Sequence, residues 1–307
     1  MKPIKNIVLL MLMLMLPILG WAQQLPQFSQ YMYNMISVNP AYAGSREFMV
    51  INILNRNQWL GVEGAPVTQT LSAHTSIPNS NVGVGVSIIN DKIGYERTTY
   101  AFADISYKLR LDAFDEYQIT FGIKGGFRKY SIDEELLNDP ASNTDPFLNQ
   151  VDYSWAPNFG VGVYFRGDSF YLGLSSPKLF APKNSSEFLP IDRVSYFFNG
   201  GYMFDVNRNL QWKPTFLVKY TDGAPLSFDF SSMFYIKEYL WLGVSYRVSD
   251  SIGAIVNFKI TEGLSAGYSY DYITSDLTSY TSGSHEIMLN YEFEFPKPRC
   301  KCKDLYN

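Results

Sequence analysis

The sequence predicts an all-β transmembrane barrel whose antiparallel strands run up and down, and three observations support this prediction. Between residues 46 and 295, segments of about ten residues alternate large apolar side chains with small or polar ones, and a turn follows each segment. The chain has 22 Phe and 23 Tyr, and a water-exposed surface with so many aromatic rings would aggregate. After the amino-terminal region, no apolar run is long enough for a membrane helix. We therefore expect strands to carry these rings to the lipid.

Residues 1–22 have the pattern of a secretory signal peptide. Two lysines precede an apolar stretch over residues 7–19, and small residues surround a tryptophan just before Ala22. We expect cleavage near Ala22 and a mature protein in the outer membrane of a Gram-negative bacterium. The alternative is an uncleaved anchor, for which this apolar stretch is short.

The composition excludes other classes of protein. The formal net charge is −4 and basic residues do not cluster, which argues against nucleic-acid binding and against a purely electrostatic membrane contact. No linker rich in proline, glycine or serine divides the chain. We therefore expect one barrel domain over residues 46–295, a periplasmic or lumenal segment over 23–45 before it, and a basic tail over 296–307 after it.

The strand predicted over residues 117–128 shows how the alternation assigns the two faces. Its odd positions are apolar or glycine and its even positions are polar or glycine, so Lys124 and Arg128 are expected to face the lumen. The reverse register would turn both cations toward lipid, at a cost of up to about 2–4 kcal/mol each near the midplane. Residues 240–248 and 264–272 alternate in the same way.

The remaining strands have weaker contrast between their faces. They are expected over residues 46–54, 67–76, 82–88, 100–111, 159–165, 170–174, 196–204, 216–220, 228–236, 252–260 and 287–295. The first of these is apolar on both faces, which leaves open that it packs against an inner segment.

The strand over residues 100–111 changes phase. Tyr100 and Phe102 lie on even positions, whereas the apolar residues from Ile105 onward lie on odd ones. We expect a β-bulge near Ala103 or Asp104, because one extra residue resets the alternation.

Loop lengths test this scheme independently. The long connections, over residues 131–154, 176–193 and 273–284, all follow strands that run in the same direction, and short turns separate the others. Outer-membrane barrels have long extracellular loops and short periplasmic turns, so both chain ends are expected in the periplasm. The strand number is then even: we predict fourteen, with about twelve or sixteen as alternatives.

Residues 27–44, with the sequence QFSQYMYNMISVNPAYAG, lie outside the repeat and do not resemble a strand. Asn39-Pro40 favours a turn, and Gly44 permits an unusual backbone angle. Two alternatives remain open for this segment: a periplasmic linker packed under the barrel, or a plug inside the lumen.

The same segment, followed by Asn57-Gln58-Trp59 and by the strand at residues 82–86, resembles the PorP/SprF family of outer-membrane proteins. The resemblance extends over essentially all of the mature chain, although residues 35–38 depart from many relatives. The residues that match the family motif are Gln27, Phe28, Ser29, Gln30, Tyr31, Met32, Asn39, Pro40, Ala41, Tyr42, Ala43 and Gly44.

This resemblance implies a role in the type IX secretion system and the gliding-motility machinery of Bacteroidota. It implies a barrel that helps to export secreted cargo bearing a type B carboxy-terminal domain, or that holds such cargo at the cell surface. It also implies periplasmic partners that link the secretion apparatus to peptidoglycan. No catalytic residue, cofactor or metal comes with the resemblance.

Motifs for enzymatic or metal chemistry are weak. Cys300 and Cys302 in the basic tail supply two thiols, whereas a stable zinc site needs about four ligands. His74 and His285 are each interpreted as lumen-facing polar side chains. The acidic group at residues 133–145 has no spacing typical of a calcium loop, so we interpret it as a solvated loop.

Three functions therefore compete. The first is a non-enzymatic component of protein export. The second is a porin or hydrophobic-solute transporter, and the third is an outer-membrane hydrolase. The second would draw its selectivity from charged side chains facing the lumen, for which the candidates are Lys124, Arg128, Lys219, Arg247 and Lys259.

Overall fold

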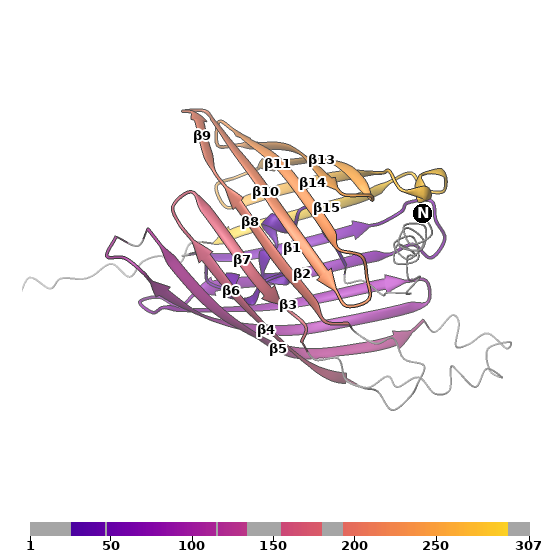
Figure 1. Ribbon diagram of the computed structural model, residues 1–307, viewed down its shortest axis with the longest axis horizontal. Helices are drawn as coiled ribbons and strands as arrows, with labels where there is room; N and C mark the ends of the chain where they lie inside the picture. The colour runs from indigo at the N-terminus through magenta and orange to yellow at the C-terminus, as the bar shows by residue number, and fades with distance from the viewer. Residues whose placement is uncertain (1–25, 47, 115, 134–154, 180–192, 294–307) are drawn as a thin grey trace, which may run out of the picture.

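A single antiparallel sheet closes into a barrel in the computed structural model (Figure 1), which describes residues 26–46, 48–114, 116–133, 155–179 and 193–293. The last strand, β15, pairs with β1, and this pairing closes the sheet. Strands β8 and β9 follow one another along the same neighbour, β10, so together they occupy one of fourteen strand positions. The predicted all-β barrel of about fourteen strands is confirmed.

The strands follow the chain order around the barrel, each antiparallel to its neighbours. Their bounds are β1 Met49–Asn57, β2 Val67–Ser76, β3 Val82–Ile93, β4 Glu96–Arg110, β5 Gln118–Ile132, β6 Trp155–Arg166, β7 Phe170–Ser176 and β8 Ser195–Tyr202. The chain continues with β9 Phe204–Asn207, β10 Leu210–Thr221, β11 Ser227–Ile236, β12 Leu240–Arg247, β13 Ser251–Lys259, β14 Leu264–Ile273 and β15 Ser284–Phe293.

Burial alternates along the strands as expected for a barrel in lipid. In β5, Ile123 is 64% exposed while the neighbouring Lys124 is 1% exposed. Val244 in β12 and Ile287 in β15 are likewise exposed apolar residues. Side chains that face the filled lumen are buried, so these exposed apolar side chains point outward. They form the surface that meets lipid. Among the described residues, no helix is both long and apolar enough to cross a membrane.

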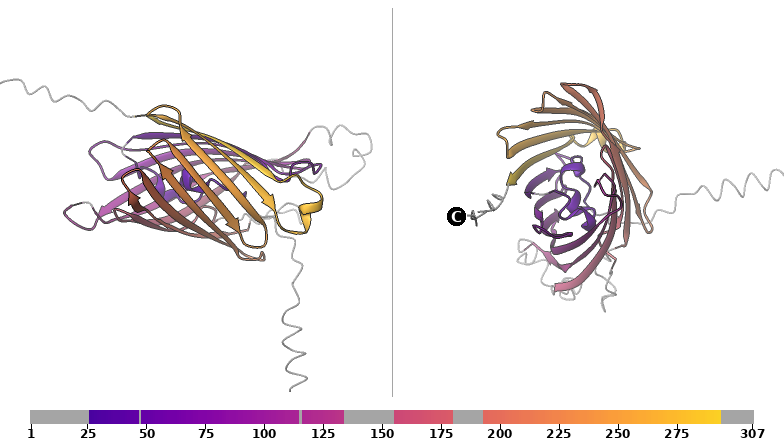
Figure 2. Two further views of the ribbon diagram at one scale, coloured as in Figure 1. Left: turned by 90° about the horizontal axis from the view of Figure 1, so that it is seen from above. Right: turned by 90° about the vertical axis from the view of Figure 1, so that its left-hand side faces the viewer.

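The two ends of the barrel differ. The strand ends that are joined by residues 58–66, 133–154, 177–194 and 274–283 lie at one end, and the turns at the other end are mostly short. The end with the long connections is extracellular and the end with the short turns is periplasmic. Figure 2 shows the strands inclined to the long axis between these two ends.

The β-bulge expected near Ala103 or Asp104 is absent, and that prediction was wrong. Strand β4 keeps one uninterrupted register with β3 and with β5. Tyr100 and Phe102 instead face inward, where they are buried with Ile89 in a small apolar cluster. The apolar pattern on the sequence changes phase because two inward positions of this strand carry aromatic residues, so the backbone needs no extra residue.

Two further details differ from the sequence prediction. The strand expected over residues 196–204 is interrupted at Met203, whose backbone N–H donates to Ser169 across a neighbouring turn. His285 in β15 pairs in register with the outward-facing Tyr270, and its Nδ1 lies 2.7 Å from the hydroxyl of Tyr268. The lumen-facing interpretation of His285 was therefore wrong, although it is right for His74, which is buried.

Candidate functional site: a plug in the lumen

The amino-terminal residues 26–46, called the plug below, run through the lumen from one end to the other. Seen along the barrel in Figure 2, the indigo segment lies inside the ring of strands. At the extracellular end, the side-chain amide of Gln27 donates to Ser227 and Asp229 of β11. At the periplasmic end, Gly44 packs against Gly83. Of the two alternatives for this segment, the structure has the lumenal plug.

The plug has no strand and is built from three short 3₁₀ helices, η1 Tyr31–Tyr33, η2 Met35–Ser37 and η3 Pro40–Tyr42. Asn39 begins the last one, because its side-chain oxygen accepts the backbone N–H of Ala41 at 2.9 Å and proline follows at the first helical position. Gly44 then adopts a φ of +66°, a backbone angle that is unfavourable for residues with a side chain. The turn predicted from Asn39-Pro40 is thus present.

Inward-facing glycines make room for the periplasmic half of the plug. A Cβ atom on Gly83 of β3 would overlap the carbonyl of Ala43. One on Gly122 of β5 would overlap the backbone of Ala41, and one on Gly162 of β6 would overlap the side chain of Asn39. The glycines on these strands therefore let the NPAYAG backbone approach the barrel wall.

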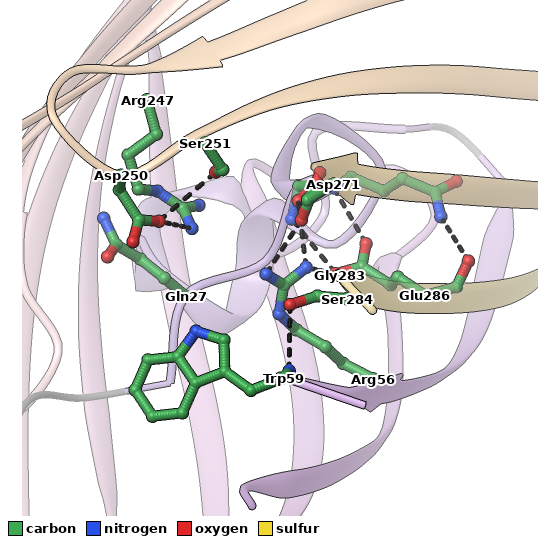
Figure 3. Close-up of polar contacts among 12 residues, drawn as sticks. Gln27, Arg56, Trp59, Arg247, Asp250, Ser251, Asp271, Gly283, Ser284 and Glu286 are labelled. Carbon is green, nitrogen blue, oxygen red and sulfur yellow. Dashed lines mark hydrogen bonds and ion pairs between the residues drawn. The ribbon is translucent and has the colours of Figure 1, made fainter. Parts of the chain in front are cut away.

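The extracellular half of the plug is held by a buried ionic cluster (Figure 3). Arg56 of β1 lies 3.1 Å from Glu286 and 2.8 Å from Asp271, and all three side chains are at most 2% exposed. Glu286 also accepts the backbone N–H groups of Ser29 at 3.0 Å and Gln30 at 2.8 Å. The carboxylates thus bind the plug and the cation together, which satisfies charges that burial would otherwise penalise.

Further polar contacts surround the middle of the plug. Lys124 lies 2.9 Å from Asp104 and donates to the carbonyl of Ile36 at 3.2 Å. Asn34 donates to Thr70 and accepts from Ser72, both on β2. These partners lie on β2, β4 and β5, whereas Gln27 bonds to β11 and Ser29 to β15, so the plug is attached around much of the barrel's circumference.

Apolar packing completes the site. Phe28, Tyr31, Met32, Met35 and Val38 of the plug belong to one buried cluster. Their partners from the barrel wall are Leu54, Phe197, Leu217, Met233, Ile255 and Met288. This core explains why β1 is apolar on both faces: its inward face packs against an inner segment.

One plug tyrosine also bonds to the barrel wall. Tyr31 is buried, and its hydroxyl donates to Thr215 of β10 at 3.0 Å.

Most residues of the family motif lie inside the barrel. Phe28, Ser29, Gln30, Tyr31, Met32, Asn39, Pro40, Ala41, Ala43 and Gly44 are buried, while Gln27 and Tyr42 are half-buried. The motif is therefore the part of the plug that the lumen encloses.

The five charged residues that were predicted to face the lumen differ in their burial. Lys124, Arg128, Lys219 and Arg247 are buried within the barrel, and Arg247 pairs with Asp229 at 2.6 Å. Lys259 is exposed at the periplasmic end of β13. Glu286 was not singled out from the sequence, because this residue precedes the expected start of its strand. The signal that could have found it is the alternation with Ser284, which places both side chains on the inward face of β15.

Several predicted features lie outside the described residues. These are the signal peptide with Ala22, most of the acidic loop, and the tail with Cys300 and Cys302. Asp133, at the start of the acidic loop, is described and pairs with Lys92 at 2.6 Å.

Together, the closed barrel, its lipid-facing apolar surface and its filled lumen define a plugged outer-membrane β-barrel. The chain belongs to the PorP/SprF family of type IX secretion system membrane proteins, because the family model matches residues 21–291. The matched residues include the whole plug and all the barrel strands except the last two residues of β15, and the family expected from the plug motif is confirmed.

Solved β-barrels are similar to this chain at low sequence identity. The CymD monoaromatic hydrocarbon channel has a TM-score of 0.52 at 10% identity, over 86% of this chain and 93% of that chain. The P. putida toluene transporter TodX gives 0.47 at 7% identity, over 84% and 93%. The KdgM porin gives 0.36 at 11% identity, over 80% and 99%. No protein with a curated description matches the chain.

Proposed function

We propose that this membrane component of the type IX secretion system is non-enzymatic and assists the export or surface attachment of cargo with a type B carboxy-terminal domain. The observation that supports it most is the plug, which belongs to the same chain and fills the lumen through buried ionic and apolar contacts. A barrel filled in this way acts as a docking platform in the membrane, and its long extracellular connections are the surface on which cargo is recognised.

The proposal extends to location and partners. Cleavage near Ala22 would release the mature chain into the periplasm for insertion into the outer membrane. Periplasmic proteins linked to peptidoglycan would then meet the short turns and the basic tail over residues 296–307, which anchors the barrel to the rest of the secretion apparatus.

Deletion of the gene tests the proposal. We expect the deletion strain to lose particular secreted proteins with a type B domain from its cell surface, and the wild-type gene to restore them. Surface proteomics by mass spectrometry measures this loss. An unchanged set of surface proteins would contradict the proposal, and recovery of such cargo with the detergent-solubilised barrel would support it independently.

The second candidate is a porin or hydrophobic-solute transporter. The likeness of the fold to a hydrocarbon channel is the observation in its favour. Planar-bilayer recordings separate the two functions, because a plug held by buried contacts predicts little steady conductance. A large steady conductance, together with altered solute uptake in the deletion strain, would favour the transporter.

A further inference from the structure

A polar cavity of about 270 Å³ lies at the periplasmic end, between the plug and strands β6, β7, β8 and β10. The plug contributes Ser45 and Arg46, and the barrel wall contributes Arg166, Tyr171 and Lys213. Asp168, on the short turn between β6 and β7, is exposed, so the cavity is reached from the side of the short turns.

The cavity carries an excess of positive charge. Arg46, Arg166 and Lys213 line it from three different segments, and Asp168 is the one carboxylate among its described lining residues. Within the described part of the chain, Lys213 forms no ion pair, and its Nζ lies 5.7 Å from the ring of Tyr171. Arg166 uses one nitrogen to donate to the carbonyl of Ser45 at 3.0 Å. Arg166 and Lys213 are half-buried and Arg46 is exposed. Converging cations, of which two are partly removed from water, are unfavourable without an anion.

Two buried hydroxyls strengthen this pattern. The hydroxyl oxygens of Tyr171 and Ser45 are buried and have no hydrogen-bond partner among the residues that the structure describes. Both residues line the cavity. The ring of Tyr171 stacks on Tyr164 with centroids 5.6 Å apart, which fixes where its hydroxyl lies. Buried polar groups are normally paired, so each hydroxyl is a donor available to a ligand.

We propose that this cavity binds an oxyanion, a carboxylate or a phosphate group, that enters from the periplasm. Arginine presents several N–H donors in a fork that matches both groups, and lysine adds a point charge. The volume suits a single charged group or a short chain end rather than a large ligand. An anion bound here contacts Ser45 and Arg46 together with Arg166 and Lys213, so it ties the end of the plug to β6 and β10.

Binding to the purified, full-length mature barrel in detergent micelles tests the site. Inorganic phosphate is titrated by isothermal calorimetry at low ionic strength, and a short peptide with a free carboxy terminus is titrated beside its amidated form. We expect saturable binding of phosphate, of the free peptide, or of both. Tighter binding of phosphate assigns the site to phosphate groups, whereas a preference for the free over the amidated peptide assigns it to carboxylates.

Variants connect the binding to this cavity. Lys213→Met and Arg166→Gln are each expected to weaken binding by about tenfold or more, because each removes a charge-assisted contact. Tyr171→Phe removes only the hydroxyl and keeps the ring stack, so it should weaken binding without affecting the fold. Lys92→Met is the matched control: it removes an amine that pairs with Asp133 at the extracellular end.

Three results would overturn the proposal: no saturable binding of any probe, wild-type affinity in all three cavity variants, or an equal loss in Lys92→Met. Circular dichroism and the thermal unfolding temperature of each variant separate loss of binding from loss of fold. Because the assay measures ligand binding and not secretion, a negative result would not contradict the proposed role in export.

Discussion

The two halves of the plug are held to the same barrel by different forces. Near the extracellular end, the backbone of Ser29 and Gln30 is bound by Glu286, whose charge is balanced by Arg56. Near the periplasmic end, residues 39–44 carry no charge and fit against inward glycines of β3, β5 and β6. The first half depends on charge balance, and the second depends on shape. The charged half is therefore the part that a change of charge should loosen, while residues 39–44 should respond most to changes in volume and in local hydrogen bonding.

Arg56→Met should have the largest effect, because it leaves Glu286 and Asp271 buried without their cation. We expect a loss of about 3–5 kcal/mol in the free energy of unfolding. Denaturant unfolding of the barrel in lipid vesicles, followed by tryptophan fluorescence, measures it. Adding Glu286→Gln removes one stranded charge and should restore part of the loss. A double variant as unstable as Arg56→Met alone would show that lost packing, rather than charge, explains the effect.

Gly122→Ala tests the half that depends on shape. The added methyl group overlaps the backbone of Ala41, so the plug or strand β5 has to shift, at a cost of about 1–3 kcal/mol. Gly125→Ala is the matched control on the same strand, since nothing lies within 4 Å of the added carbon. The same unfolding assay compares the two. Equal stability of both variants would contradict the close fit.

Asn39→Ala removes the cap of the last 3₁₀ helix and the bond from its amide to the carbonyl of Val163. We expect a loss of about 0.5–2 kcal/mol, in the range for cap removal. Hydrogen exchange at the backbone amide of Ala41 should rise in parallel, because its acceptor is gone. Unchanged exchange there would mean that packing alone holds this turn.

The smallest effect is expected from Asp112, which lies on a periplasmic turn away from the plug. Its carboxylate accepts the backbone N–H groups of Phe114, Glu116 and Tyr117. The hydrogen bond from the backbone N–H of Tyr117, together with the weaker ones from Glu116 and Phe114, holds the pKa of this carboxyl below its usual value. A depressed folded-state pKa stabilises the turn above the unfolded-state pKa, and this stabilisation is lost as the pH falls through the folded-state value.

Amide exchange of this turn, measured between pH 6 and pH 3, checks the prediction. Exchange corrected for its intrinsic pH dependence should rise at the acidic end in the wild-type barrel. In Asp112→Asn it should be raised already at neutral pH and change little on acidification. Parallel pH profiles in the two proteins would rule out this role for Asp112.

Much of the barrel could be predicted from the sequence. Strand positions, the inward direction of Lys124 and Arg128, and the position of the long connections follow from a local alternation with a period of two. The prediction failed where the lumen is not uniformly polar. Tyr100 and Phe102 were assigned to the lipid face because of their chemistry, yet they lie inside, where the ring of Phe102 is 4.9 Å from the amine of Lys124.

The sequence by itself therefore determined the class of fold, the strand number and the family. These depend on which face of each strand meets lipid, and every second residue reports that face. Only the tertiary structure decided that residues 26–46 fill the lumen, that Arg56, Asp271 and Glu286 meet there, and that basic residues line a cavity beside Tyr171. Closure of the barrel brings residues separated by more than two hundred positions, such as Ser29 and Glu286, into contact, and no local pattern records such a pairing.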